Sequence, residues 1–375
     1  MFERIRAILI KEFKQIFRDP RMKTVIFVTP IIQIILFGYA ANRDITYVPT
    51  AIFDRDNTKE SRELLREFTY SKYFIPEHYI FTEKEQNSVL DRGTASIVIH
   101  IDRGFGRDLN AGKDASVQLA FDGTDSNTAM VVMGYANTII NNFQYDFMKQ
   151  KAQSLGWEKP VPEVDLRDRA WFNGNLVSRN YYLPGVIATI VTMMSLLLTA
   201  MAIVKEKEIG TMEQLTVSPL KPIELIVGKL LPFAIISLVQ ITLITIFGVA
   251  WFHIPLRGNL LLLLFSTCIY LFTTLGIGLF ISTISATQQE AMMSVFLFYM
   301  PTVLLSGFAY PIANMPSVIQ WFTFINPLRY FLVVIRSIFL KGIGIDILWV
   351  QLIPLVIMGI IIIGFSALKF RKSLG

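Results

Sequence analysis

Long apolar runs alternate with charged segments along this chain. Tyr182–Val204 and Leu230–Phe252 each extend for 23 residues without a charged side chain. A helix of about 20 apolar residues is long enough to cross the hydrocarbon core of a bilayer. The pattern predicts a polytopic α-helical membrane protein with six transmembrane helices, at residues 24–42, 181–204, 230–252, 260–283, 290–309 and 347–368.

Residues 1–23 predict a helix of another kind. Apolar side chains recur about once per turn and basic side chains fill much of the remainder, which is typical of a helix lying in the membrane interface. Asp19-Pro20 should end this helix. A signal peptide is the alternative, because a basic start precedes an apolar run. The length of the leader and its acids Glu3, Glu12 and Asp19 favour an uncleaved first span.

The segment between the first two spans, residues 43–180, changes character. It holds 17 Lys/Arg and 20 Asp/Glu, which indicates a soluble domain. Strand and helix patterns alternate, and this order predicts a compact α/β domain. The expected strands are Tyr47–Phe53, Ala95–Ile101 and Ser116–Phe121, and the expected helices are Thr58–Thr69, Glu83–Arg92 and Ser126–Ser154.

Nothing in this domain predicts catalysis. Asp54-Arg-Asp56 and Asp122-Gly-Thr-Asp125 supply carboxylates, but such pairs after strands are more often turns. The chain has three histidines and one cysteine, Cys268, so no zinc-ligand spacing and no internal disulfide is expected. We therefore expect a non-catalytic protein that binds no metal or cofactor directly.

The longest uncharged run, Ala291–Leu328, has 38 residues and contains four prolines. It is too long for one straight crossing. We therefore expect a span to about residue 309, followed by an external segment, residues 310–346, that re-enters the membrane or lies along its interface. Such a segment needs protein or water to satisfy its backbone.

Short segments near the membrane give the orientation. Residues 1–23, 205–229 and 369–375 hold 14 Lys/Arg, whereas the short segments on the other side, 253–259 and 309–346, hold four. Loops rich in Lys/Arg stay in the cytoplasm. Both termini and the 205–229 hairpin are therefore expected to be cytoplasmic, with residues 43–180 extracytoplasmic and residues 369–375 a cytoplasmic tail.

The hairpin KEKEIGTMEQLTVSPLKPIELIVGK, residues 205–229, is the most informative stretch. Its first half is rich in helix formers, broken by Gly210, and Ser218-Pro219 should stop it. A solvated loop is one interpretation. The other interpretation rests on a sequence motif. The E-x-E-x-G-T-x-E-Q pattern between two spans closely resembles the corresponding segment of the ABC-2 family of ATP-binding-cassette transporter permeases. In that family this segment is the coupling helix that docks onto the ATPase.

Two other stretches carry the same resemblance, which covers nearly the whole chain. Gly93–Ala129 is similar to the extracytoplasmic domain of the drug-exporter branch, although Asp102-Arg-Gly-Phe105 replaces a proline-containing segment. Ser306–Gly342 matches the family through its Asn-Pro-Leu triplet at 326–328 and its FLKG ending. Asn173-Gly174 stands where relatives usually have Asn-Pro.

The resemblance implies a permease subunit that exports hydrophobic or amphiphilic, drug-like compounds across a bacterial cytoplasmic (inner) membrane. The chain has no G-x-x-x-x-G-K-[ST] phosphate loop. ATP and magnesium would therefore bind a separate ATP-binding subunit. The other expected partners are a second permease copy or a paralogue, membrane lipids and an envelope adaptor. No nucleic-acid partner is expected. The residues implied in ATPase coupling are Glu206, Glu208, Gly210, Thr211, Glu213 and Gln214.

Polar residues near the membrane are candidates for the gate or pathway: Glu290, Asn326, Arg329 and Arg336. The alternatives are a helix-capping acid at Glu290 and arginines that reach the interface. Other functions also stay open, namely a lipid or glycan exporter, or a receptor with an extracellular sensing domain. A receptor predicts no stoichiometric ATPase partner.

Overall fold

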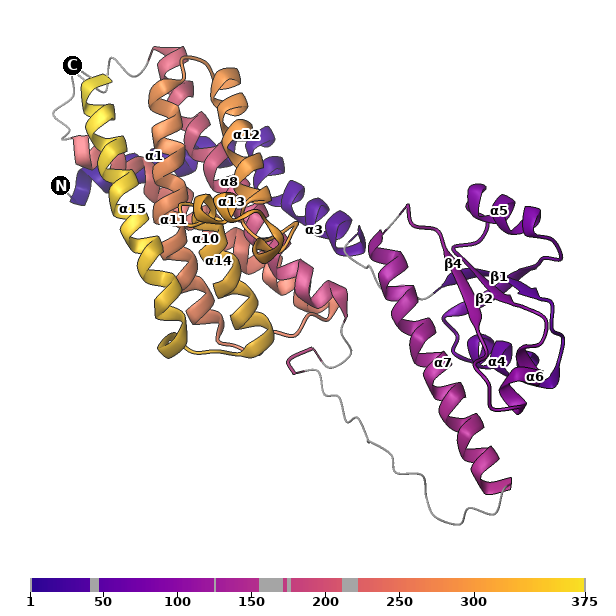
Figure 1. Cartoon of the computed structure of the whole chain (residues 1–375). Coiled ribbons are helices and arrows are strands. Elements are labelled where there is room, and N and C mark those ends of the chain that lie inside the picture. The colour runs from indigo at the N-terminus through magenta and orange to yellow at the C-terminus, as the bar shows by residue number, and fades with distance from the viewer. Residues whose placement is uncertain are drawn as a thin grey trace. The chain divides into compact units, whose positions relative to one another are not determined.

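The computed structural model describes residues 2–40, 47–124, 126–154, 171–173, 177–210 and 222–373. The chain divides into two compact units (Figure 1). One unit comprises Met1–Arg43 and Arg169–Gly375, and the other comprises Asp44–Asp168. The first is helical, and the second is an α/β domain.

The α/β domain is built on a four-stranded sheet of order β2-β1-β3-β4. The central strand β1 (Val48–Asp54) runs parallel to β2 (Phe74–Tyr79) and to β3 (Ile97–Ile101). The edge strand β4 (Val117–Phe121) pairs antiparallel with β3. All five side chains of β3 are buried, as expected for a strand covered on both faces.

Helices cover both faces of this sheet. Helices α4 (Lys59–Tyr70), α6 (Phe105–Asn110) and α7 (Ser126–Ser154) pack on the face that carries Ile97 and Ile99. Helix α5 (Glu83–Asp91) packs on the other face, against Phe53 and Val98. Alternation along the strands sorts the side chains between the two cores.

The expected strands and helices of this domain are confirmed within a few residues, and Thr58 caps α4 by accepting the Ser61 N–H. Two elements were not predicted. Strand β2 contains Pro76, which argues against a central strand, but β2 lies at the sheet edge, where a missing N–H is tolerated. Helix α6 is only six residues long, too short for a periodic pattern.

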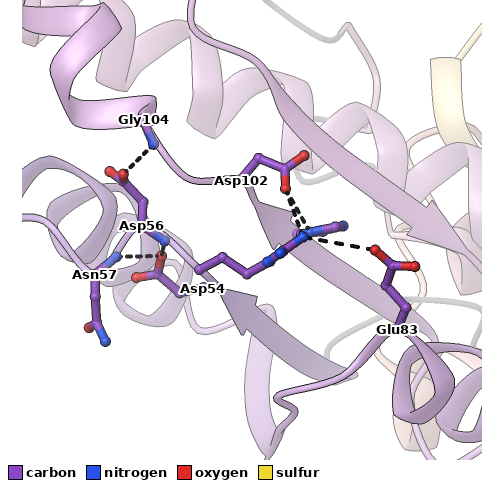
Figure 2. Close-up of polar contacts among 8 residues, drawn as sticks. Asp54, Asp56, Asn57, Glu83, Asp102 and Gly104 are labelled. Carbon is purple, nitrogen blue, oxygen red and sulfur yellow. Dashed lines mark hydrogen bonds and ion pairs between the residues drawn. The ribbon is translucent and has the colours of Figure 1, made fainter.

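The Asp54 and Asp56 carboxylates build the turn after β1 (Figure 2). Asp54 accepts the N–H groups of Asp56 and Asn57 at 3.0 Å. Asp56 reaches across to the start of α6, where it accepts the Gly104 N–H at 2.7 Å and the Gly106 N–H at 2.8 Å. Gly104 has φ +96°, a conformation that favours glycine. These carboxylates are turn formers, as their spacing predicts.

The helical unit contains α1, an apolar helical stretch and a set of longer helices. Their bounds are α1 (Phe2–Arg18), α2 (Pro20–Lys23), a π-helix (Thr24–Val28), α3 (Thr29–Ala40), α8 (Ser178–Ile209), α10 (Pro222–Phe252), α11 (Leu260–Ile284), α12 (Gln288–Leu304), a 3-10 turn (Ile312–Asn314), α13 (Ser317–Thr323), α14 (Pro327–Arg336), a second π-helix (Ser337–Lys341) and α15 (Ile345–Ser373).

Among the described residues, four helices are long and apolar enough to cross a membrane. They are Ser178–Ile209, Ile223–Phe252, Leu260–Ile284 and Ile345–Lys369. A fifth is added if Ser317–Thr323 and Pro327–Lys341, bent by 80°, count as one broken span. The apolar stretch Thr24–Ala40 and α12 are shorter. The chain is thus a helical membrane protein whose described residues include four to five apolar spans, and the expected six stay a prediction.

Several boundaries differ from the expected ones. Helix α8 continues five residues past Val204, and α10 begins eight residues before Leu230, so both spans extend into the charged hairpin. Helix α12 ends at Leu304, five residues before the expected end of that span. A bend at Gly307, whose φ is +84°, follows.

Small residues and buried hydroxyls join these helices. Gly276 on α11 brings the backbone close to Ile363 on α15, and Gly278 brings it close to Thr199 on α8. Close approach through glycine is how membrane helices gain packing contacts. The Tyr270 hydroxyl of α11 lies 2.6 Å from Thr192 Oγ1 of α8, so these two buried hydroxyls are partners of each other.

We predict that Asp56 makes the α/β domain sensitive to acid. Burial opposes its charge, but hydrogen bonds from Thr58, Gly106 and Gly104 hold the pKa of Asp56 below its usual value. A depressed carboxylate pKa stabilises the folded domain above pH 4 or so and ceases to do so as the pH falls through the folded-state pKa. Asp56→Asn should cost about 1–3 kcal/mol at pH 7 and flatten this dependence.

Hydrogen exchange of amides 97–110 in the detergent-solubilised full chain, corrected for intrinsic rates between pH 7 and pH 3, measures this. Asp91→Asn, at an exposed carboxylate in the last turn of α5, is the matched control. Equal pH profiles for wild type and Asp56→Asn would contradict the assignment.

Candidate functional site

The last turn of α8 brings three consecutive charged residues, Glu206, Lys207 and Glu208, to one end of the helical unit. This charged end is where α8 ends and α10 begins. Successive side chains on a helix point about 100° apart, so the three face different directions. Each of them contacts a different part of the bundle.

Glu206 joins α8 to α1 and α10. Its carboxylate forms ion pairs with Lys11 of α1 at 2.6 Å and with Lys229 of α10. Glu206 is 4% exposed and Lys229 is 3% exposed, so this pair lies inside the bundle. Glu12, 5% exposed, lies 3.5 Å from the Lys11 Nζ on α1. A buried charge pair of this kind is costly to break, because the charge left behind has no water.

Lys207 caps the end of α11. Its Nζ donates to the backbone oxygen of Ser282 at 2.7 Å and to those of Thr283 and Ser285 at 3.4 Å. Ser282 and Thr283 lie in the last turn of α11 and Ser285 directly follows it, and the last carbonyls of a helix have no partner within it. A cation also complements the negative end of the helix dipole.

Glu208 caps the start of α12. It accepts the backbone N–H of Gln288 at 2.7 Å and the side-chain amide of the same residue. The first amides of a helix need acceptors, and an anion complements the positive end of its dipole. Lys207 and Glu208 thus hold the two sides of one turn, Ser285–Thr287, between α11 and α12.

Glu290 completes that turn. Thr287 Oγ1 accepts the Glu290 N–H at 3.2 Å, and the Glu290 carboxylate accepts the Ala286 N–H at 2.7 Å. This reciprocal arrangement resembles a capping box. The geometry matches the capping interpretation of Glu290.

Two further ion pairs link the N-terminal segment to this end. Arg4 lies 3.6 Å from Glu224 of α10, and Lys205 of α8 lies 3.8 Å from Asp19. The methyl groups of Ile8 lie where a Cβ on Gly228 would stand, so α1 packs closely on α10. The predicted amphipathic helix is therefore packed on the ends of two apolar helices, and its place in the membrane interface stays a prediction.

Gly210 ends α8 in the left-handed conformation, with φ +78°. Glycine is favoured there because other residues pay a steric penalty. Thr211, Glu213 and Gln214 lie outside the described residues. The described part of the motif is thus built into the bundle, and the remainder directly follows Gly210.

Asn326 marks the break between α13 and α14. Its side chain accepts the Leu328 N–H at 3.0 Å and donates to the Thr302 carbonyl of α12 at 2.7 Å. The Asn-Pro-Leu triplet therefore caps α14 and ties the break to α12. The side chain of Phe331, further along α14, stacks on Tyr270 of α11 with ring centres 4.1 Å apart.

The two arginines of this segment contact aromatic rings. Arg329 lies 4.0 Å from the ring centre of Phe324 and donates to Thr323 Oγ1. Arg336 lies 4.0 Å from the ring centre of Tyr181 and donates to the Gly307 carbonyl at 3.3 Å. The structure does not bring Glu290, Asn326 and the two arginines together into one site.

The candidate site residues predicted from the sequence included no lysine. Lys11, Lys207 and Lys229 supply the counter-charges and caps, and a lysine beside a span has no distinctive local signal. One pattern hints at them: the alternation KEKE at 205–208 places opposite charges on adjacent faces. Among the described residues, no three His, Cys, Asp or Glu side chains are grouped to hold a metal ion.

We predict that the Glu206–Lys229 pair is a stability element. Glu206→Gln, which leaves Lys229 buried without this carboxylate, should cost about 3–5 kcal/mol, and Lys229→Met, which leaves Glu206 paired with Lys11 alone, should cost less. The double variant should recover much of the loss. Apparent melting temperature in detergent measures the effect, and Lys205→Gln, at the half-exposed neighbouring pair, should change it little. Additive losses in the double variant would refute the pairing.

Comparisons with known proteins bear on this architecture. The family model of the ABC-2 family transporter protein matches residues 23–368. The probable multidrug ABC transporter permeases YbhR and YbhS of Escherichia coli K12 are 34% and 30% identical to this chain. These alignments cover 95% of this chain and 95% of YbhR, and 100% of this chain and 98% of YbhS.

The linearmycin resistance permease protein LnrN of Bacillus subtilis is 24% identical over 85% of this chain and 86% of its own length. The family match covers both the apolar helices and the α/β domain between them. This chain belongs to the ABC-2 transporter family.

Proposed function

We propose that the chain is the membrane-spanning subunit of an ATP-driven exporter, and that the charged end of α8 transmits the driving motion. The observation that carries this is the set of contacts from three consecutive residues. Glu206 holds α1 and α10, Lys207 holds α11, and Glu208 holds α12. A displacement of the segment after Gly210 would therefore reach four other helices through the last turn of α8.

A separate ATP-binding subunit supplies the energy, since the chain has no phosphate loop. It docks on the segment that includes Thr211, Glu213 and Gln214, on the cytoplasmic side. Two permease copies or paralogues form the pathway in the bacterial inner membrane, with residues 43–180 outside. Relatives named multidrug permeases support hydrophobic or amphiphilic cargo.

In this proposal, the break between α13 and α14 responds to the motion at the charged end. Asn326 ties the break between α13 and α14 to Thr302 of α12, and α12 is also held by Glu208 at its other end. A shift of α12 along its axis would therefore move the break. Motion at the charged end thus reaches the opposite side through a single helix.

The first experiment is gentle-detergent purification of the tagged chain, with mass spectrometry of the proteins that accompany it. We expect an ATP-binding subunit in stoichiometric amount, lost on replacing Glu213 with Ala. A clean homo-oligomer without an ATPase, binding a soluble ligand through residues 43–180, would overturn the proposal in favour of a receptor.

We predict that Lys207→Met and Glu208→Ala separate hydrolysis from transport. Lys207→Met removes a part-buried hydrogen bond from a charged group, worth about 1.5–3 kcal/mol, and Glu208→Ala removes the exposed cap of α12, so each variant frees one side of the α11–α12 turn. In proteoliposomes containing both subunits, ATP hydrolysis should persist while export per ATP falls about tenfold, as 1.4 kcal/mol corresponds to one decade. Lys205→Gln, in the same part of α8, removes only the ion pair with Asp19 and is the matched control. Unchanged export per ATP in both variants would exclude this route.

A further inference from the structure

An apolar groove of about 600 Å³ lies between α11, α12 and α15. Its walls include Ile277, Ile281, Leu297, Phe298, Ile362 and Phe365. Two hydroxyls line it, and Ser366 already donates to backbone oxygens of Ile362 and Gly276. Among the described lining residues, none is charged. The volume is in the range of small-molecule sites.

The ends of the groove show where along the bundle it lies. Ile284 and Ser294 line one end, close to the α11–α12 turn that Lys207 and Glu208 hold. Ile325 and Pro327 line the other end, at the break between α13 and α14. The groove therefore occupies the half of the bundle nearer the charged end and stops beneath the break.

The groove opens to the surroundings along its length. Leu297 is 79% exposed and Ile325 is 73% exposed. In a membrane protein, such a surface faces hydrocarbon, not water. An empty apolar groove forfeits dispersion contacts along its walls, so a flexible hydrocarbon chain is the occupant that restores them.

A cation, Lys369, lies beside the groove. The Lys369 Nζ is 5.4 Å from the ring centre of Phe280, which lines the groove. The side chain of Lys369 is exposed, so its ammonium group is free to meet an anion. Glu290 lines an adjoining depression, and its carboxylate accepts the Ala286 N–H.

We propose that this groove admits the hydrocarbon chain of an anionic amphiphile from the bilayer, with its headgroup at Lys369. The inference rests on the proposed function, for which it names the cargo class and the place of entry. An amphiphile bound here has its chain beneath the α13–α14 break, whose movement would then decide whether the chain passes outward. The charge at Lys369 favours an anionic headgroup over a zwitterionic one.

The test uses the full chain in lipid nanodiscs, without any ATPase, so failed transport cannot be mistaken for failed binding. The probe is a phosphatidylglycerol with a diazirine in its acyl chain, compared with the matching phosphatidylcholine. After illumination, mass spectrometry locates the labelled peptides. We expect labels on α11, α12 and α15, stronger with the anionic probe.

Variants test whether the labelled lipid lies in the groove and whether Lys369 binds its headgroup. Ser294→Trp fills the groove and should abolish its labelling, whereas Met300→Trp, on the same helix but away from the lining, should not. Ser294→Leu serves if the larger side chain aggregates. Lys369→Gln should lower labelling by the anionic probe about fivefold, the effect of one exposed ionic contact, and Lys369→Arg should restore it.

Three outcomes overturn the proposal. One is equal labelling by both probes in wild type, and another is label in the groove that survives Ser294→Trp. The third is a disulfide between two copies of Leu297→Cys, in a Cys268→Ser background, that forms in place of labelling. That last outcome would show that a second copy covers the groove.

Discussion

Charged side chains at the edge of a membrane need partners, and this requirement organises the helical unit. Glu206, Lys207 and Glu208 cannot follow α8 into lipid without a large cost. Each instead finds a partner on a neighbouring helix: an ion pair for Glu206, the last carbonyls of α11 for Lys207, and the first amide of α12 for Glu208. The groups most costly to bury thus become the contacts that connect the helices.

The same logic explains why one turn of helix connects so much. A helix end offers unpaired backbone groups and a partial charge, so an adjacent ion of the right sign binds it tightly. Two successive residues of α8 use opposite signs on opposite helix ends. The α11–α12 turn is therefore fixed on both sides, and the capping hydrogen bonds of Thr287 and Glu290 stiffen it from within.

The α/β domain shows how far a local pattern determines structure. Its long helix Ser126–Ser154 and the strands around Phe53, Ile99 and Leu119 follow from local patterns, namely continuous apolar runs, alternation and helical period. Strand β2 does not, because its proline is acceptable only at a sheet edge, and edge position is a tertiary fact. Asp56 is similar: sequence identifies a turn former, but only the fold brings Gly104 and Gly106 within reach.

For the membrane part, the sequence by itself determined the apolar helices, the family and the residues of the charged hairpin. The reason is that the length of an apolar run and a short sequence motif can both be recognised from neighbouring residues alone. The sequence did not determine what those residues contact. Glu206 and Lys229, or Lys207 and Ser282, are far apart in sequence, and a lone charge carries no mark of its partner. Only the packing of α8 against α10, α11 and α12 decided which charge meets which helix end, because those distances arise from tertiary structure.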